Sequence, residues 1–153
     1  MFERVIDNVL QTNPEVIIVA AAGNRSLQLV DFPARFSNVV AVGAIDSLKH
    51  VASYSNTGAI DQSGSPHSRL YFAPGGGNGE FVGNTITAAG KKTDHEGTSF
   101  AAPYVSALAA IHLEAGGGAR PTANATLAHF QNHADTTING YNASTHGNGL
   151  IRL

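Results

Sequence analysis

Two short, unbroken apolar runs, residues 16–22 and 39–45, place the strongest constraint on the fold of this chain. Both are rich in β-branched side chains, and both are too short to read as buried helices. A strand that is apolar at every position is typical of a parallel sheet, in which both faces are covered. An amphipathic helical pattern over residues 2–10 precedes the first run. The order of helix, buried strand, loop and buried strand predicts an α/β fold.

Residues 46–97 have a different composition, rich in Gly, Ser, Asn and Thr. Such residues favour turns and loops, because they tolerate unusual backbone angles or bond to their own backbone. We therefore expect surface loops here, interrupted by short strands at 51–54, 70–73, 80–82 and 85–88.

Two helices are expected downstream. Residues 99–114 are Ala-rich and mostly apolar all round, which predicts a buried helix, and Gly116-Gly117-Gly118 would stop it. A second helix is expected from an N-cap at Thr122 to about His133. The tail, residues 149–153, is expected to form a final short strand.

The composition excludes several classes of function. The 153 residues amount to about one domain, and the formal charge is -2 with no basic cluster larger than Lys91-Lys92, so neither nucleic acid nor an anionic membrane is an expected partner. The absence of Cys excludes disulfides, thiolate zinc sites and cysteine nucleophiles. No segment approaches the roughly 18 to 20 apolar residues that span a bilayer, and the first residues lack the features of a signal peptide.

Two polar residues stand where parallel-sheet chemistry is usually found. Ser99, in Gly97-Thr98-Ser99, opens the predicted buried helix, where free backbone N–H groups and the positive end of the helix dipole favour a developing negative charge. Asn24 ends the first buried strand, and its side-chain amide is a second donor for an oxyanion. An isolated Gly-Thr-Ser would more simply be a helix cap.

Five motifs occur in a shared order. They are Val-Ala-Ala-Ala-Gly-Asn at 19–24, Phe-Pro-Ala-Arg-Phe at 32–36, Ala-Pro-Gly at 73–75, Gly-Thr-Ser-Phe-Ala-Ala-Pro at 97–103 and Gly-Asn-Gly-Leu-Ile at 147–151. Together they resemble the subtilisin-like serine proteases over essentially the whole chain. The resemblance implies an α/β subtilisin-like parallel-sheet sandwich with flanking helices, of which residues 1–153 form the C-terminal portion.

The resemblance assigns roles to single residues. It implies that Ser99 is the nucleophile of a serine endopeptidase, acting through an acyl-enzyme on peptide or protein substrates, and that Asn24 and the Ser99 backbone form the oxyanion hole. It also implies that Ala22, Gly23 and Asp31 bind substrate, and an acidic Asp31 at the pocket floor would favour Lys or Arg in the substrate. The alternative is that Asp31 simply pairs with Arg25 or Arg35.

No cofactor is required by this resemblance. It implies a cis Phe32-Pro33 bond and a weak structural Ca²⁺ or Na⁺ site at the carbonyls of Ala34 and Phe36. His129 and His133 are four residues apart on a predicted helix, a spacing that suits zinc, but no third ligand is evident, so we expect a solvent-facing pair and no metal site.

The base and the orienting acid of a catalytic triad are missing. In this family both lie upstream of the oxyanion Asn, whereas Asp61-Gln62-Ser63-Gly64 and His146-Gly147-Asn148 fit neither motif, and His95 is expected to be a surface residue. We therefore expect this chain alone to be inactive, to expose the edge of its first strand, and to need the N-terminal half of the domain as a partner. The alternative is a non-catalytic, peptide-binding or partner-complemented chain. The family also suggests secretion.

Overall fold

The computed structural model describes residues 2–86, 88–90, 92–115 and 121–152. The helices and strands follow one another in the order α1 (Phe2–Thr12), β1 (Val19–Ala21), β2 (Val40–Ile45), β3 (Leu70–Pro74), β4 (Gly83–Ile86), β5 (Lys92–His95), α2 (Thr98–Glu114), α3 (Ala123–His133) and α4 (Ala143–His146).

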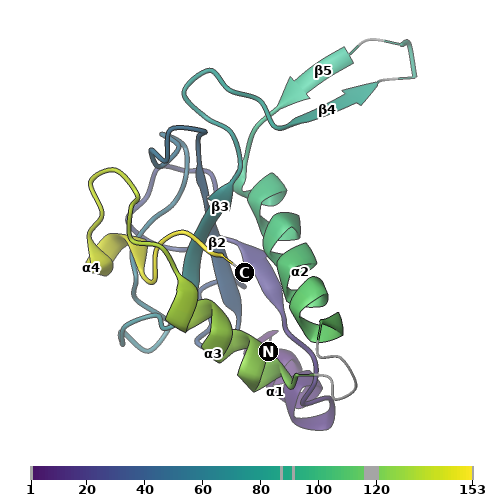
Figure 1. Ribbon diagram of the computed structural model, residues 1–153, viewed down its shortest axis with the longest axis vertical. Coiled ribbons are helices and arrows are strands. Elements are labelled where there is room, and N and C mark those ends of the chain that lie inside the picture. Colours follow the sequence, from purple (N-terminus) through teal and green to yellow (C-terminus); the bar gives the residue numbers. More distant parts are fainter. Residues whose placement is uncertain (1, 87, 91, 116–120, 153) are drawn as a thin grey trace.

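A three-stranded parallel sheet in the order β1-β2-β3 forms the centre of the molecule (Figure 1). The register pairs Ala20 with Ala41 and Gly43 with Phe72. Every residue of β2 is buried, as its continuous apolar run predicts. The α/β expectation is therefore confirmed, and the carboxyl ends of all three strands meet at one edge of the sheet.

The two faces of the sheet are covered differently. Val40, Val42 and Ala44 share one core cluster with Ala101 and Val105 of α2, which lies along this face (Figure 1). The alternate residues of β2 belong to a second cluster on the opposite face, where loops supply most of the cover. That cluster contains Ala22, Val30, Ala34, Ala41, Ile45, Ala59, Leu70, Phe72 and Ile138.

Helix α2 is less buried than its composition suggests. Its residues that pack on the sheet are covered, but Tyr104 is 45% exposed and Ile111 is 54% exposed on its outer side. The expectation of an all-round buried helix is therefore wrong for this flank. Helix α3 agrees with its prediction, since the Thr122 side chain caps it by accepting a hydrogen bond from the Ala125 N–H at 3.1 Å. The glycine stop at 116–118 lies outside the described residues.

The short strands are the least accurate part of the prediction. Residues 70–73 are confirmed within β3, but 51–54 contribute only a bridge at Val51, after which residues 53–54 form a turn. The strand expected at 85–88 is confirmed at Thr85 and Ile86, which lie in β4; residue 87 lies outside the described residues, and 80–82 contribute only a bridge at Glu80. The hairpin of β4 and β5 projects from the rest of the molecule (Figure 1). In the tail, Leu150 makes isolated bridges to Phe72 and Asp135 in place of a strand.

Residues 46–69 are not simply surface loops. Five polar residues in this segment are buried: Asp46, Ser55, Asn56, Asp61 and His67. Each makes hydrogen bonds within the protein, which offsets the cost of removing it from water. The loop is therefore part of the internal support of the sheet edge.

Candidate active site

Ser99 is an exposed residue in the first turn of α2. Gly97 precedes the helix and has no side chain to cap it; the Thr98 N–H bonds to Asn24 and the Phe100 N–H donates to the Gly97 carbonyl at 2.9 Å. The Gly97 N–H donates to the Gly75 carbonyl at 2.9 Å, which ties the start of α2 to the end of β3. The Ala-Pro-Gly motif therefore lies beside the start of the helix that carries Ser99.

Asn24 lies three positions after the last residue of β1 and meets the start of α2. Its Oδ1 accepts two hydrogen bonds from Thr98, at 3.0 Å from the backbone N–H and at 2.8 Å from the hydroxyl. Because a backbone N–H must face an oxygen, this contact fixes the orientation of the amide group. The Nδ2 group of Asn24 is thereby left as a donor beside the start of the helix that carries Ser99.

Gly23 and Gly97 allow this close approach. Gly23 has φ of 109°, and a Cβ there would lie 2.2 Å from Asp31 Oδ2 and 2.4 Å from Asn56 Nδ2. Gly97 has φ of 152°, and a Cβ there would lie 3.2 Å from Asn24 Nδ2. The Gly23 N–H also donates to Thr98 Oγ1 at 3.3 Å. The strand end and the helix start therefore lie close together; a Cβ on Gly97 would crowd the Asn24 amide, and one on Gly23 would collide with Asp31 and Asn56.

The structure brings Asn24 and Ser99 together at the carboxyl edge of the sheet, with Gly23 beside them. A hydroxyl at a helix start, with its own N–H and a side-chain amide nearby, can stabilise an oxyanion formed when the hydroxyl attacks a carbonyl. Ala22 is placed differently, since it is fully buried and its side chain does not reach the surface that a substrate would contact.

Asp31 pairs with Arg25, the alternative that the sequence left open. The guanidinium donates through both Nε and Nη2 to the two carboxylate oxygens, and the hydrogen bond raises the pKa of Arg25. The Asp31 carboxylate also lies against Gly23. The negative charge beside the site is therefore balanced by a cation from the same loop, and a preference for basic substrates stays a prediction.

Asn56 is the residue that sequence reasoning missed. It is fully buried below the loop that carries Asn24, and its side chain bonds to the backbone at three points in that loop. An Asn within a Ser, Asn, Thr and Gly stretch is ordinarily a turn residue, so composition gave no signal of its burial.

The carbonyls expected to bind a weak cation are already engaged. The Ala34 carbonyl accepts a hydrogen bond from His67 Nε2 at 2.8 Å, and the Phe36 carbonyl accepts from the Val39 N–H at 3.0 Å. Each carbonyl oxygen has a second lone pair, so a Ca²⁺ or Na⁺ site at Ala34 and Phe36 stays a prediction. The Phe32-Pro33 bond is cis, as expected. Burial lowers the pKa of His67, consistent with a neutral ring that donates through Nε2 and accepts the Arg69 N–H through Nδ1.

The His and Asp residues considered for the triad have other surroundings. His146 packs against Phe72, on the face of the sheet opposite α2, and Asp61 bonds to Ser63 and its neighbouring backbone. His95 is half-buried, not a plain surface residue, and its ring stacks on Phe100 with the centroids 6.0 Å apart.

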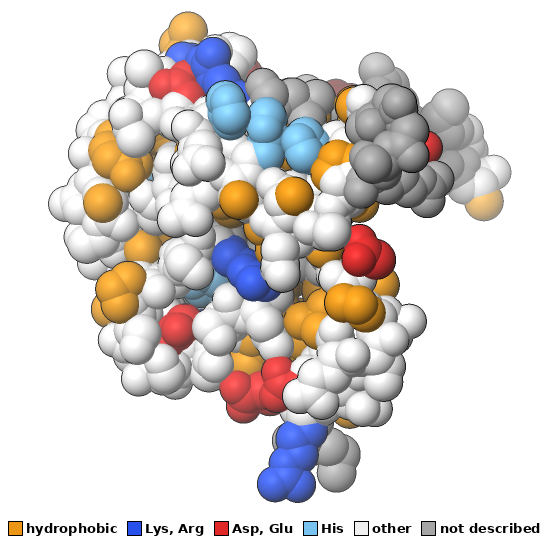
Figure 2. All heavy atoms as spheres, turned by 60° about the horizontal axis from the view of Figure 1, so that its bottom comes forward, with side chains coloured by type: hydrophobic (Ala, Val, Ile, Leu, Met, Phe, Trp, Pro, Cys, Tyr) orange, Lys and Arg blue, Asp and Glu red, His pale blue; other side chains and the backbone are white. Residues whose placement is uncertain are grey.

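His112 of α2 joins His129 and His133 in a row of imidazoles, which Figure 2 shows on one face of the molecule. The ring centroids lie 4.3 Å apart for His112 and His129, and 4.1 Å apart for His129 and His133. The expected pair is thus a three-membered stack. In the described part of the chain, no group of three or more His, Cys, Asp or Glu side chains is placed to hold a metal ion.

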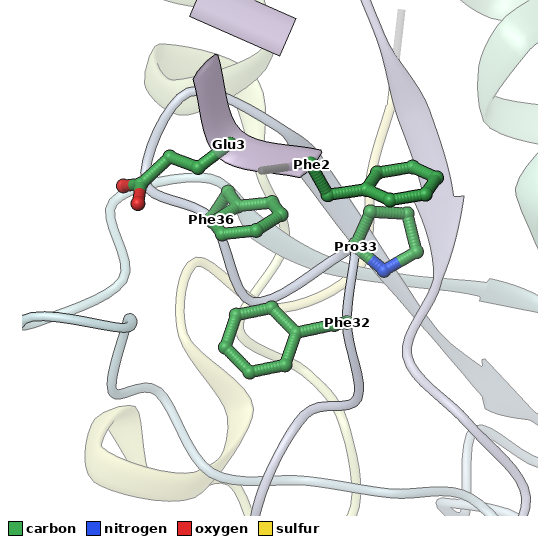
Figure 3. A pocket seen from close by; sticks show the side chains of 5 residues that line it. All are labelled: Phe2, Glu3, Phe32, Pro33 and Phe36. Carbon is green, nitrogen blue, oxygen red and sulfur yellow. The ribbon is translucent and has the colours of Figure 1, made fainter. Parts of the chain in front are cut away.

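An apolar hollow of about 450 Å³ lies between the start of α1 and the Phe-Pro-Ala-Arg-Phe motif. Figure 3 shows the rings of Phe32, Pro33 and Phe36 gathered below Phe2, with the Glu3 carboxylate turned aside. None of the residues proposed for catalysis lines this hollow, so it is separate from the site. Among the described helices, none is long and apolar enough to cross a membrane.

A nucleophilic hydroxyl and an amide donor at the carboxyl edge of a parallel sheet form an arrangement that serine hydrolases use. The comparisons with known proteins identify the family: residues 3–149 match the model of the subtilase family, peptidase S8, so the chain belongs to that family and has its α/β fold.

Individual relatives agree with this assignment. Subtilisin DY from Bacillus licheniformis is 32% identical over 143 residues, which cover 90% of this chain and 45% of that protein. A cuticle-degrading serine protease from Arthrobotrys oligospora is 37% identical over 111 residues, 71% of this chain and 24% of the relative. The structure of the self-cleaved protease domain of PatA matches with a TM-score of 0.73 and 26% identity, over 98% of this chain and 51% of that one. The chain thus spans about half the length of these proteins or less.

Proposed function

We propose that this chain carries the nucleophile and the oxyanion hole of a subtilisin-like serine endopeptidase. The observation that carries the proposal is the contact of Thr98 with Asn24 Oδ1, which leaves Asn24 Nδ2 beside the start of the helix that bears Ser99. Both Asn24 and Ser99 are exposed, as residues that meet a peptide substrate must be.

The reaction follows from these groups. Ser99 Oγ attacks the carbonyl carbon of the peptide bond while a general base takes its proton. The resulting oxyanion accepts hydrogen bonds from the Ser99 N–H and from Asn24 Nδ2. The C–N bond then breaks, the amine leaves with the proton returned by the base, and water hydrolyses the ester on Ser99.

The base and its orienting acid are proposed to come from a segment outside residues 1–153, the N-terminal half of the domain. The matches to about half of each relative support this. So does the edge of the described sheet: β1 is its outermost strand with residues only half-buried, and Val16, just before this strand, is an exposed apolar side chain. Residues 1–153 alone are then inactive.

The competing proposal is a non-catalytic or partner-complemented chain that keeps the peptide groove. The DNA upstream of Met1 separates the two. Under the endopeptidase proposal it continues in frame into a segment with Asp-Ser-Gly or Asp-Thr-Gly and His-Gly-Thr motifs. A genuine start signal at Met1 with no such segment would favour the competing proposal.

The activity test uses two proteins: residues 1–153, and the same residues joined to the segment that the gene encodes upstream, called here the assembled enzyme. The assembled enzyme should cleave a chromogenic peptide, and Ser99→Ala should abolish cleavage. Cleavage by residues 1–153 alone that Ser99→Ala abolishes would contradict the proposal that the base comes from outside.

We also propose that the protein is exported, because a matched relative is named for degrading cuticle, a material outside the cell. Detection of the protein in the culture medium of its source, and not in the cell fraction, tests this.

A further inference from the structure

The side chain of Asn56 uses its hydrogen-bonding groups on a single loop. Its Oδ1 accepts the backbone N–H of Arg25 at 2.9 Å and that of Leu27 at 3.1 Å, while its Nδ2 donates to the Ala22 carbonyl at 3.1 Å. Its backbone N–H donates to the Gly23 carbonyl at 2.9 Å. Four hydrogen bonds therefore join one fully buried residue to residues 22–27.

These bonds lie on both sides of Asn24 in the chain. Two end on the residues just before it, Ala22 and Gly23, and two end on residues after it, Arg25 and Leu27. Asn56 does not need to touch the Asn24 side chain, since it holds the backbone from which that side chain extends. Thr98 holds the amide group itself from the opposite direction. The direction of Asn24 Nδ2 is thus set by a buried support and by a contact at the helix start.

The close packing around Gly23 also indicates that Asn56 supports the backbone beside Asn24. A Cβ on Gly23 would lie 2.4 Å from Asn56 Nδ2, so the loop backbone rests directly on the Asn56 amide. Removing that amide would leave two N–H groups and a carbonyl without their partner, and the loop would rearrange to satisfy them. An oxyanion hole depends on donors at fixed positions, so small displacements cost catalysis.

We propose that Asn56 is a positioning residue for the oxyanion hole, acting through the backbone on either side of Asn24. The proposal rests on the proposed function, in which Asn24 is an oxyanion donor. It assigns a catalytic consequence to a residue that lies in a different loop, 32 positions further along the chain.

The test is a double-mutant cycle in the assembled enzyme. Asn56→Ala should lower kcat by about tenfold or more while KM changes little. In the Asn24→Ala background, Asn56→Ala should lower kcat no further, because the donor that it positions is already gone. Asn148→Ala is the matched control, since Asn148 donates to the Ser68 carbonyl away from the site, and it should leave kcat unchanged.

An equal loss of kcat in both backgrounds would show a general structural role and overturn the proposal, as would an unchanged kcat in the single variant. If Asn24→Ala itself leaves kcat unchanged, the oxyanion assignment has failed, and the proposal for Asn56 falls with it. Amide hydrogen exchange distinguishes these cases, because the positioning contact predicts faster exchange of the Arg25 and Leu27 amides in Asn56→Ala, whatever the role of Asn24.

Asn56→Asp is the conservative variant, measured beside Asn56→Ala, or against the parent alone if Asn56→Ala does not fold. It keeps an acceptor for the Arg25 and Leu27 N–H groups but loses the donor to the Ala22 carbonyl. Exchange of those two amides should stay slow, with kcat below that of the parent and above that of a folded Asn56→Ala. A kcat equal to that of the parent, or equal to that of Asn56→Ala with both amides protected, would contradict positioning through these bonds.

Discussion

Thr98 donates both its backbone N–H and its hydroxyl to Oδ1 of Asn24, at 3.0 and 2.8 Å. The contact joins the end of the first strand to the start of the helix that carries Ser99. Two donors on one oxygen leave only one orientation for the amide group, with Nδ2 free to face a substrate. Under the proposed function, this contact preorganises the amide donor before any substrate binds, which is what electrostatic stabilisation of an oxyanion requires.

Thr98→Val removes the hydroxyl donor but keeps the backbone N–H and nearly the same shape. Because Thr98 is buried and its hydroxyl holds the Asn24 amide, we expect kcat of the assembled enzyme to fall by about tenfold, corresponding to about 1.4 kcal/mol. Thr98→Ser keeps the hydroxyl and should retain most of the activity. Equal kcat values for the Val variant and the parent would refute this role.

Asn24→Ala removes the proposed oxyanion donor itself. In subtilisin, the loss of such a side-chain donor lowers kcat by roughly 10²–10³, and we expect a loss of that size here with little change in KM. Asn24→Asp should be at least as damaging, since it keeps the acceptor for Thr98 but places a negative charge where the oxyanion forms. Steady-state kinetics of the assembled enzyme measures both variants. A larger effect on KM than on kcat would assign Asn24 to substrate binding.

Because Arg25 neutralises the Asp31 carboxylate, we expect Asp31 to favour Lys or Arg in the substrate only when Arg25 is removed. Arg25→Ala frees the Asp31 carboxylate beside Gly23, so the ratio of kcat/KM for peptides with Lys or Arg before the cleaved bond to those with Leu should rise. Asp31→Asn in the same background should remove that gain. An unchanged ratio in Arg25→Ala would show that Asp31 does not face the substrate.

The pH dependence of stability follows from buried His67. Burial lowers its pKa in the folded state below the ordinary value of 6.5, so the unfolded chain binds a proton more readily. Its contribution to the free energy of unfolding is complete above pH 6.5 and is lost as the pH falls below that value. His129 acts in the same direction, because partial burial and then the neighbouring His133 and His112 lower its pKa.

Urea unfolding of residues 1–153 between pH 7.5 and 5 measures this. The free energy of unfolding should decrease toward pH 5, and His67→Gln should flatten the decrease. A free energy that stays constant or rises on acidification would contradict the assignment of His67 as a neutral, buried donor.

The parallel sheet, the helices α1, α2 and α3, and the placement of Asn24 after a strand and Ser99 at a helix start could all be predicted from the sequence. Residues 39–45 are apolar at every position, which only a doubly covered strand explains well. Thr122 is a typical N-cap residue, and it predicts the start of α3. Asn24 and Ser99 are recognisable because each belongs to a motif of the family, one after a strand and the other at the start of a helix.

Asn56 and His67 could not be predicted in the same way. Both lie in a segment whose Gly, Ser and Asn content resembles that of any surface loop, and their burial is decided by partners distant in the sequence. The Ala34 carbonyl that binds His67 is 33 positions away. The exposed flank of α2 is a similar case, since the number of faces that a helix buries depends on which elements surround it.

Reaction of Ser99 with a serine-directed fluorophosphonate tests the central claim most directly. Mass spectrometry should locate the adduct on Ser99 of the assembled enzyme, with labelling lost in Ser99→Ala, greatly slowed in residues 1–153 alone, and retained in His95→Gln. Labelling of residues 1–153 at the rate of the assembled enzyme, or an adduct on any residue other than Ser99, would contradict the account.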